Sequence, residues 1–424
     1  MKPLRIAVVG GGSTYTPELV EGFVRHAAEL PLEHLVLMDI SEERLRTVGG
    51  LAQRMLAPCG VEVSLTTQLD DALDGMDFVL TQMRIGGLAA RALDEQLPLP
   101  HGVLGQETVG PGGFAKALRT IPVMLTIARR MADISPDATL INFTNPAGIV
   151  TEAILRHTAT RAIGLCNVPI NLRISLAQTL NVPLEAVELE YVGLNHLSWT
   201  RVWVDGKDVT AHVLATEWGT SGGQVDAGYL KAVGLLPNYY LRYYVHPDRV
   251  LQEQKNAAQS RGQYLQTVEA ELLKLYSDPT LREKPKLLET RGGAHYSTAA
   301  VELIRSIALD RRDVLIVNTR NGTAVPDLPP DCAVEVPCVV SKTGARPLTM
   351  GSLPPTVRGL MGAVKAYEEL TIQAAVTGSE DMAIMALFSN PLVGSWDKAV
   401  ALWKAIKTAH WDYLPQFHPK GEGS

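Results

Sequence analysis

Cysteine is scarce in this chain, with four residues among 424, at positions 59, 166, 332 and 338. They are too few for the disulfide framework of a small secreted domain, and no pair has the CxxC spacing of a zinc site. The amino-terminal apolar run passes directly into glycines without a small-residue cleavage site, which predicts a first strand rather than a signal peptide. We therefore expect reduced thiols in a cytoplasmic protein.

Long hydrophobic runs and an excess of positive charge are also missing. No stretch of about 18 uncharged apolar residues occurs, which excludes a membrane-spanning helix and argues against a membrane partner. The 45 acidic and 39 basic residues are spread evenly, so no basic stripe follows a phosphate backbone, which argues against nucleic acid as a partner. With 46% hydrophobic residues, the sequence predicts a globular protein.

The first half of the sequence alternates short β-branched segments with helical periodicity, which is typical of an α/β fold with a parallel sheet. We expect strands at residues 4–10, 34–40, 77–83, 138–144 and 161–167, and helices at 16–30, 41–57 and 120–134. Beyond residue 190 we expect a hairpin closed near Asp205 and Gly206, then mostly helices. Because one core rarely exceeds roughly 250–300 residues, we expect two domains, at 1–194 and 195–424.

A glycine-rich turn follows the first strand and precedes the first expected helix. Glycines allow the backbone to approach a pyrophosphate, and the helix N-terminus offers free N–H groups and partial positive charge. The match to GxGxxG is incomplete, because Tyr15 occupies the third glycine position. The residues that this turn offers for cofactor binding are Gly10, Gly11, Gly12, Ser13 and Thr14.

Asp39 ends the second expected strand, where an acidic side chain accepts hydrogen bonds from a ribose 2′-hydroxyl and repels a 2′-phosphate. This position favours NAD over NADP. The alternative interpretation is a helix N-cap that Asp39 shares with Ser41.

Other candidate residues lie at or after the carboxyl ends of expected strands, where open α/β sheets bind ligands. Asn145 lies in a Thr-Asn-Pro segment that could be simply a tight turn, and Arg91 could belong to a solvated charged helix face. Cys166 and His196 could ligate one metal, although buried cysteine and histidine are common in protein cores. The tyrosine run at 239–244 could equally pack a core or an interface.

Six segments, taken in order, resemble one family of enzymes. The segments are GGGSTYTPEL, RIGGLAARALDEQLPLPHGVLGQETVGPGG, INFTNPAGIVTEAI, GLCNVPIN, GLNHLSW and YYLRYY. Together they resemble the NAD- and manganese-dependent glycosidases of glycoside hydrolase family four, particularly the 6-phospho-β-glucosidases. The resemblance implies a lactate/malate-dehydrogenase-like Rossmann domain followed by an α+β catalytic and oligomerisation domain, in a homodimer or homotetramer.

The chemistry that the resemblance implies differs from that of most glycosidases, which use two carboxylates. NAD removes hydride from C3 of the sugar, a base takes the C2 proton, and the aglycone leaves C1 by elimination. Water then adds, and the hydride returns. The substrate implied is a β-glucoside, in particular one that carries a 6-phosphate.

The resemblance also implies roles for individual residues. Cys166 and His196 match the ligands of Mn²⁺, an ion that usually prefers oxygen ligands, so its identity rests on the resemblance alone. Tyr240 matches the base, and Tyr239 and Tyr243 replace it if the register slips. A nearby cation must lower the tyrosine pKa from about 10.

The substrate-binding residues implied are Arg91, Asn145 and Arg261, around the 6-phosphate or sugar hydroxyls. Arginine suits this role because its guanidinium pairs two phosphate oxygens at once, although both arginines could instead form surface ion pairs. The resemblance also implies that Asn167 faces the substrate. In the family's α-glycosidases, the matching position resembles an Asp that acts as the general acid. An amide cannot donate that proton, which points to the β-specific branch.

Two other functions remain open from the sequence. The Rossmann half also resembles 2-hydroxy-acid dehydrogenases, but those enzymes place a catalytic histidine in a G-x-H-G-like turn where this chain has GLNHLSW. A catalytically silent NAD-binding sugar sensor would be expected to have lost Cys166, His196 or Tyr240, and all three are present.

Overall fold

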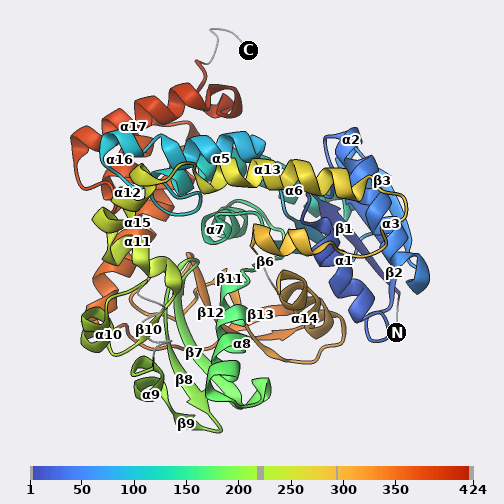
Figure 1. Ribbon diagram of the computed structural model, residues 1–424, viewed down its shortest axis with the longest axis horizontal. Helices are drawn as coiled ribbons and strands as arrows, with labels where there is room; N and C mark the ends of the chain where they lie inside the picture. Colours follow the sequence, from blue (N-terminus) through green and yellow to red (C-terminus); the bar gives the residue numbers. More distant parts are fainter. Residues whose placement is uncertain (1–2, 217–223, 293–294, 420–424) are drawn as a thin grey trace.

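The first half of the chain forms six parallel strands in the order β3-β2-β1-β4-β5-β6 (Figure 1). The computed structural model describes residues 3–216, 224–292 and 295–419. The strands are β1 (Leu4–Val9), β2 (Leu32–Met38), β3 (Glu62–Thr66), β4 (Phe78–Thr81), β5 (Thr139–Asn142) and β6 (Ala162–Gly164). This is the strand order of a Rossmann fold, and its direction reverses between β1 and β4. The sequence missed β3, an edge strand with no fully buried residue.

Helices flank this parallel region. They are α1 (Thr16–Arg25), α2 (Glu42–Arg44), α3 (Gly50–Leu56), α4 (Leu69–Leu73), α5 (Gly87–Gln96), α6 (Gly110–Ile134), α7 (Ala147–His157) and α8 (Val168–Leu180). The helix expected at 41–57 is interrupted by a π-helical turn at Leu45–Gly49, and the helix expected at 120–134 begins earlier, as part of α6.

The second half of the chain extends the same sheet with antiparallel strands. They are β7 (Val187–Leu194), β8 (Leu197–Val204), β9 (Lys207–Asp208), β10 (Leu236–Pro237), β11 (Val314–Arg320), β12 (Ala333–Ser341) and β13 (Gly344–Pro347). Asn318 on β11 pairs with Gly164 on β6, and Glu335 on β12 pairs with Gly193 on β7. The expectation of mostly helices after the first hairpin is wrong for β11–β13. These three strands pair with one another in chain order, and β11 and β12 also pair with the distant strands β6 and β7.

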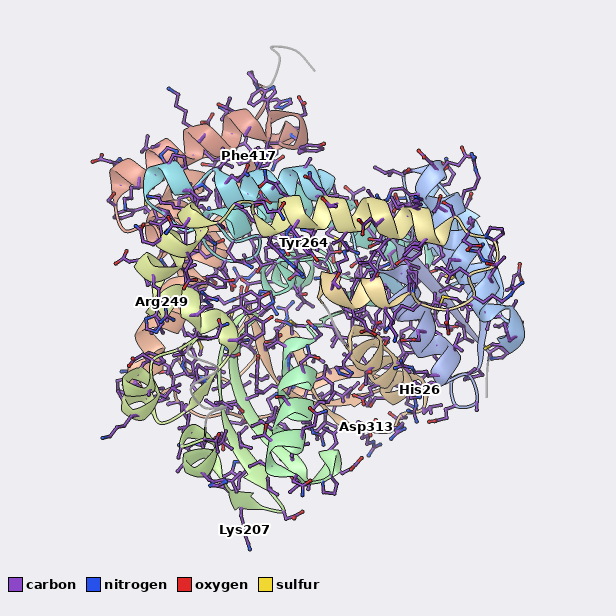
Figure 2. The ribbon with its side chains drawn as sticks, viewed as in Figure 1. His26, Lys207, Arg249, Tyr264, Asp313 and Phe417 are labelled. Atoms are coloured by element: carbon purple, nitrogen blue, oxygen red, sulfur yellow. The ribbon has the colours of Figure 1, made fainter. Side chains whose placement is uncertain are left out.

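Two hairpins share strand β8. Asp205 and Gly206 close the β8–β9 hairpin with positive φ angles of 49° and 74°, which confirms the expected turn, and Lys207 lies at its outer end (Figure 2). Asn195 and His196 close the longer β7–β8 hairpin, which the sequence analysis missed. The domain boundary expected between 194 and 195 falls in that turn. Because β7 pairs with β8 along its length, the antiparallel region begins before the expected boundary, at Val187.

The remaining helices belong to the second half of the chain. They are α9 (Thr210–Leu214), α10 (Ala227–Val233), α11 (Arg242–Val245), α12 (Pro247–Asn256), α13 (Arg261–Tyr276), α14 (Tyr296–Ala308), α15 (Pro355–Thr377), α16 (Glu380–Ser389) and α17 (Trp396–Ala409). Helix α13 packs beside α5 across the edge of the parallel region (Figure 1). Within the described ranges, no helix is both long and apolar enough to cross a membrane.

Candidate active site

A large cleft of about 1840 Å³ lies at the carboxyl ends of the parallel strands. This is where the strand order reverses and where open α/β sheets bind ligands. The expected site residues in its wall are Gly10, Ser13, Asp39, Arg91, Asn145, Cys166, Asn167, His196, Tyr240 and Arg261. The structure therefore brings most of the expected residues to one cavity.

The glycine turn packs tightly against strand β2. A Cβ atom on Gly11 would lie 2.8 Å from the Cβ of Leu37, and one on Gly12 would lie 2.9 Å from the Asp39 carboxyl carbon. The Asp39 carboxylate accepts hydrogen bonds from the Gly12 N–H, at 3.0 Å, and the Ser41 N–H, at 3.1 Å. The Ser41 side chain caps helix α2, and Asp39 holds Ser41 through its N–H, so the alternative interpretation of Asp39 stays open. Asp39 also joins the glycine turn to the end of β2.

Thr14 does not face the cleft with its side chain. The residue is fully buried, its hydroxyl donates to Glu269 at 3.3 Å, and its carbonyl accepts a hydrogen bond from the Tyr276 hydroxyl at 2.7 Å. These contacts hold the glycine turn against helix α13. Helix α13 therefore takes the Thr14 hydroxyl, and the expected part of Thr14 in cofactor binding stays a prediction.

Asp39 predicts a cofactor preference that can be measured. We expect the protein to bind NAD⁺ more tightly than NADP⁺, because a carboxylate facing a 2′-phosphate is a like-charge contact. The neighbouring cation, Arg44, is paired with Glu269 at 3.0 Å, which reduces its capacity to offset that repulsion. Calorimetric titration with NAD⁺ and NADP⁺ measures the two affinities. The Asp39→Asn substitution should make these affinities more nearly equal. Equal affinities in the wild type would reject this role of Asp39.

Cys166 and His196 lie together although 30 positions separate them in the sequence. Cys166 follows β6 and His196 lies in the β7–β8 turn, with 3.5 Å between the cysteine sulfur and the histidine Nε2. The Thr108 hydroxyl donates to the Gln106 side-chain oxygen at 2.8 Å and lies 2.9 Å from His196 Nδ1. Because that hydroxyl proton is used, Nδ1 must be the donor to Thr108. The Nε2 lone pair therefore faces Cys166, as a metal ligand requires.

Burial controls the protonation of both residues. It lowers the pKa of His196 to about 3, so the imidazole is neutral, and it raises the pKa of the Cys166 thiol to about 12. A metal ion binds the neutral imidazole directly and displaces the thiol proton. Among the described residues, no cluster of three or more His, Cys, Asp or Glu side chains could hold a metal ion. The pair fits an open metal site that leaves positions for a ligand.

Tyr240 lies directly against the cysteine–histidine pair. Its ring stacks on His196, with 3.8 Å between the ring centroids and 3° between the planes. Its backbone N–H donates to the side-chain oxygen of Asn238 at 3.0 Å. Burial raises the pKa of the Tyr240 hydroxyl well above 10, and the nearby Tyr239 raises it further. Without a cation beside it, Tyr240 is therefore a weak base.

Arg91 belongs to a cluster of cations around Glu107. Its Nη1 lies 2.8 Å from one Glu107 oxygen, Lys116 lies 2.9 Å from the other, and Arg84 also pairs with this carboxylate. Burial raises the pKa of Glu107, but the three cations outweigh burial and hold it well below its usual range. The structure supports both interpretations of Arg91, because it is ion-paired, including with Glu95 at 2.8 Å, and it still lines the cleft.

The other expected substrate residues line the cleft with different partners. Arg261, the first residue of α13, donates to the Thr290 carbonyl at 2.7 Å. Asn145 precedes a cis proline and accepts a hydrogen bond from the Ala147 N–H at 3.3 Å. Asn167 precedes helix α8. Their roles stay predictions, whereas their common position in one cavity is observed.

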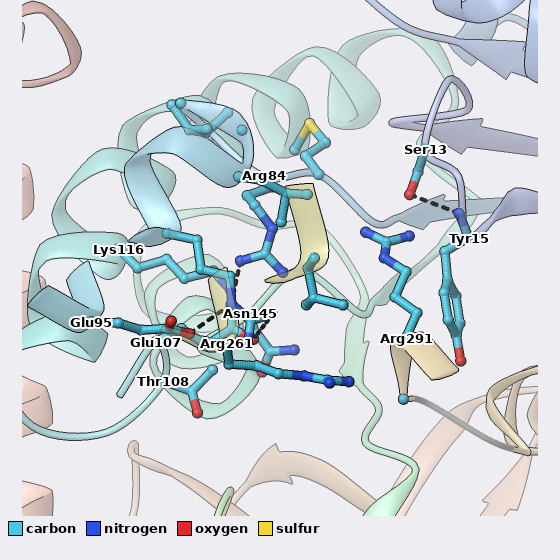
Figure 3. A pocket seen from close by; sticks show the side chains of 18 of the residues that line it. Ser13, Tyr15, Arg84, Glu95, Glu107, Thr108, Lys116, Asn145, Arg261 and Arg291 are labelled. Atoms are coloured by element: carbon cyan, nitrogen blue, oxygen red, sulfur yellow. Dashed lines mark hydrogen bonds and ion pairs between the residues drawn. The ribbon is translucent and has the colours of Figure 1, made fainter. Parts of the chain in front are cut away.

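Arg291 is a cleft residue that the sequence analysis missed. Figure 3 shows its guanidinium near Ser13 and Tyr15, pointing toward the middle of the pocket. It lies over the Tyr15 ring at 5.4 Å, and within the part of the chain that the structure describes its Nη1 has no hydrogen-bond partner. Burial lowers its pKa to about 10, and the nearby charge of Arg84 acts in the same direction. Two close guanidinium groups in one cleft suit an anionic ligand.

The missed residues Glu107 and Thr108 lie within one of the quoted segments. That segment begins at Arg84, which follows the third expected strand at the ligand-binding edge. The signal that could have found them is density of charge: this segment has several ionisable residues in a helix-and-loop region that follows the carboxyl end of β4. Arg291 had no comparable signal, because its Arg-Gly-Gly context is common in surface loops.

The chain belongs to family 4 of the glycosyl hydrolases. The model described as "Family 4 glycosyl hydrolase" matches residues 5–182, and the model of its C-terminal domain matches residues 191–393. A probable 6-phospho-β-glucosidase of Bacillus subtilis is 46% identical, over 99% of both chains. The expected family is confirmed.

Solved structures agree with this assignment. The 6-phospho-β-glucosidase from Thermotoga maritima, solved with manganese, NAD⁺ and glucose-6-phosphate, is 36% identical with a TM-score of 0.90, over 97% of this chain and 99% of that one. A lactate dehydrogenase from a deep-sea metagenome library covers 89% of this chain and 100% of its own, with a TM-score of 0.57 and 13% identity. That second similarity shows the fold alone and confirms the expected Rossmann-like architecture.

Proposed function

We propose that this family 4 glycosidase hydrolyses 6-phospho-β-glucosides, using NAD and a divalent metal ion such as Mn²⁺. The observation that carries the proposal is the stack of Tyr240 on His196 beside Cys166, at the ligand-binding edge of a Rossmann sheet. Under this proposal Cys166 and His196 are the metal ligands and Tyr240 is the base, and their proximity in a single cleft supports these roles. The dehydrogenase alternative has only a similarity of fold in its favour.

The cofactors supply the chemistry that the side chains lack. The glycine turn and Asp39 would hold NAD, which would supply reversible hydride transfer at C3 of the sugar. Cys166 and His196 would hold a divalent ion, which would supply Lewis-acid stabilisation of the charge that develops on the sugar. Tyr240 then takes the C2 proton, the aglycone leaves C1 by elimination, and water adds before the hydride returns. The ion is also the cation that lowers the pKa of Tyr240.

The cationic residues of the cleft support a phosphorylated substrate. Arg91 and Arg261 reach the cavity from facing helices, α5 and α13, and Arg291 approaches beside Ser13. Guanidinium groups bind phosphate oxygens in pairs. Asn167 supports the β-specific assignment, because an amide cannot protonate a leaving group as a carboxylic acid does.

We also propose that the enzyme is a cytoplasmic homodimer or homotetramer. All four cysteines are free thiols, as expected in a reducing compartment. Phe388 and Trp396 pack edge to face at 5.7 Å and remain 45% and 47% exposed. Such an apolar surface beside α16 and α17 favours contact with a second copy.

The direct test compares 4-nitrophenyl β-glucoside with its 6-phosphate, in the presence of NAD⁺, Mn²⁺ and a thiol reductant. We expect turnover of the phosphorylated compound and a kcat/KM at least tenfold lower for the other. The 4-nitrophenyl α-glucoside 6-phosphate is the stereochemical control. Absence of turnover for both β-compounds under these conditions would reject the proposed activity.

A further inference from the structure

A buried carboxylate lies behind the cysteine–histidine pair and has no role in the steps described above. Glu335, on strand β12, is 1% exposed. It accepts hydrogen bonds from the Tyr191 hydroxyl at 2.7 Å, from the Asn195 amide at 3.0 Å and from the Asn318 amide at 2.9 Å. All three donors are neutral, and no charged side chain of the described ranges pairs with Glu335. A buried carboxylate without an opposite charge is costly.

The first connection runs from Glu335 to the metal pair. The Asn195 amide that donates to Glu335 also hydrogen-bonds the Cys166 sulfur. Burial and the negative charge of Glu335 raise the pKa of Cys166, whereas this hydrogen bond lowers it, so the thiolate needs a cation beside it. Asn195 directly precedes His196 in the β7–β8 turn, where His196 has a positive φ of 66°. One amide therefore links the carboxylate to one metal ligand and holds the turn that carries the other.

The second connection runs from Glu335 to Tyr240. The Tyr191 hydroxyl, which donates to Glu335, accepts a hydrogen bond from the Ser198 hydroxyl at 2.6 Å. The Asn238 amide donates to the same Ser198 hydroxyl at 3.2 Å, and its oxygen accepts the Tyr240 N–H at 3.0 Å. Tyr191, Ser198 and Asn238 are all buried. A continuous chain of buried hydrogen bonds thus joins Glu335 to the backbone of Tyr240.

We propose that Glu335 is a positioning residue that orients Cys166, His196 and Tyr240 from behind and whose charge favours a divalent cation at the pair. This inference rests on the proposed metal site. A thiolate and a neutral imidazole neutralise one of the two charges of the ion, and Glu335 supplies the second across the Asn195 amide. The ion in turn supplies the opposite charge that the buried carboxylate lacks. Outer-shell partners of this kind orient ligands and tune metal affinity.

The test is the Mn²⁺ affinity of Glu335→Gln, measured from the free-ion electron paramagnetic resonance signal in the presence of NAD⁺ and without substrate. The substitution removes the negative charge. It also replaces the oxygen that accepts the Tyr191 hydroxyl in the wild type with an N–H₂ group. We expect Mn²⁺ to bind about 10–100-fold more weakly. The near-ultraviolet thiolate absorption of the Co²⁺-substituted enzyme should fall as well, whereas NADH affinity should be unchanged.

Glu18→Gln is the matched control, because it makes the same change at a buried carboxylate on α1 that is paired with Lys284 and lies outside the cleft. Its Mn²⁺ affinity should stay within about twofold of wild type. An equally small change in Glu335→Gln would overturn the proposal. Failure of the wild type to bind Mn²⁺ would instead reject the proposed metal site itself.

Asn195→Ala tests the route through the amide. It should also weaken Mn²⁺ binding, and the double variant with Glu335→Gln should lose much less than the product of the two single losses, because both act through one connection. If the loss of Mn²⁺ affinity in the double variant equals the product of the two single losses, the connection through the Asn195 amide is rejected. If Glu335→Gln does not fold, Asn195→Ala alone decides, since this half-buried turn residue is easier to replace, and unchanged Mn²⁺ affinity would reject the proposal.

Discussion

Tyr240→Phe is expected to lower turnover by about 10²–10⁴-fold, the range typical of losing a general base. The phenylalanine ring can keep the stack on His196, and the Asn238 cap depends on the backbone N–H rather than on the hydroxyl. NAD⁺ and Mn²⁺ should therefore bind as in the wild type. Steady-state kinetics, together with cofactor and metal titrations, separate this loss of chemistry from a loss of structure.

The same base has an isotopic consequence. If Tyr240 removes the C2 proton, products formed in deuterated water should carry deuterium at C2, which a hydrolase with two carboxylates cannot produce. Wild-type product without deuterium at C2 would reject the elimination mechanism, whatever the kinetics of the variant show.

Two neighbouring tyrosines serve as controls. Tyr239 is 49% exposed, with its ring centroid 4.5 Å from that of Tyr240, and Tyr243 lies 5.8 Å away. Of these three tyrosines, only Tyr240 stacks on His196. Tyr239→Phe and Tyr243→Phe should therefore each lower turnover by less than about tenfold. A deuterated product together with a nearly active Tyr240→Phe variant would keep the chemistry and move the base to one of these two residues.

The parallel half of the fold could be predicted because its determinants are local. Each central strand is a short β-branched run buried on both faces, and the intervening helices have apolar residues three and four positions apart. The sequence therefore located β1, β2, β4, β5 and β6, and only the half-exposed strand β3 was missed. The glycine turn could also be predicted from the sequence, because a close backbone approach requires glycine.

The antiparallel half could not be predicted in the same way. Strand β12 pairs with β11, β13 and β7, and the last of these precedes it by more than a hundred residues. No short window contains that information. Glu335 is an example of a residue that the sequence could not single out. Nothing in its own valine-rich strand distinguishes it from other acidic residues. It becomes a candidate for function only when the sheet places it behind Asn195.

The site, like the fold, could be predicted only in part from the sequence. Cys166, His196 and Tyr240 could be singled out because their residue types match a chemistry, yet only the fold brings them together at the cleft. Side-chain direction was the hardest feature to foresee. Thr14 lies in the expected turn, but helix α13 offers Glu269 to its hydroxyl, so the side chain turns away from the cofactor edge.

Exhaustive chelation is expected to abolish activity, and added Mn²⁺ should restore it. Among the described residues, no third His, Cys, Asp or Glu side chain joins Cys166 and His196 in a metal-binding cluster, so we expect a chelator to remove the ion. Chelated enzyme should still bind NADH, because the glycine turn and Asp39 lie at a separate part of the cleft. Full activity after chelation would reject the metal-site assignment.

Cys166→Ser should reproduce the effect of chelation without recovery by moderate Mn²⁺ concentrations. The loss in kcat/KM should exceed the roughly 10–100-fold that is typical of removing an outer-shell partner, because the substitution replaces a thiolate ligand with a neutral hydroxyl. Oxidation of Cys166 to sulfenic acid should act in the same way and be reversed by thiol plus Mn²⁺. Cys59→Ser is the matched control, since Cys59 is a partly exposed thiol outside the cleft. It should keep full activity and remain sensitive to oxidation, whereas an active Cys166→Ser enzyme with normal Mn²⁺ affinity would place the metal elsewhere.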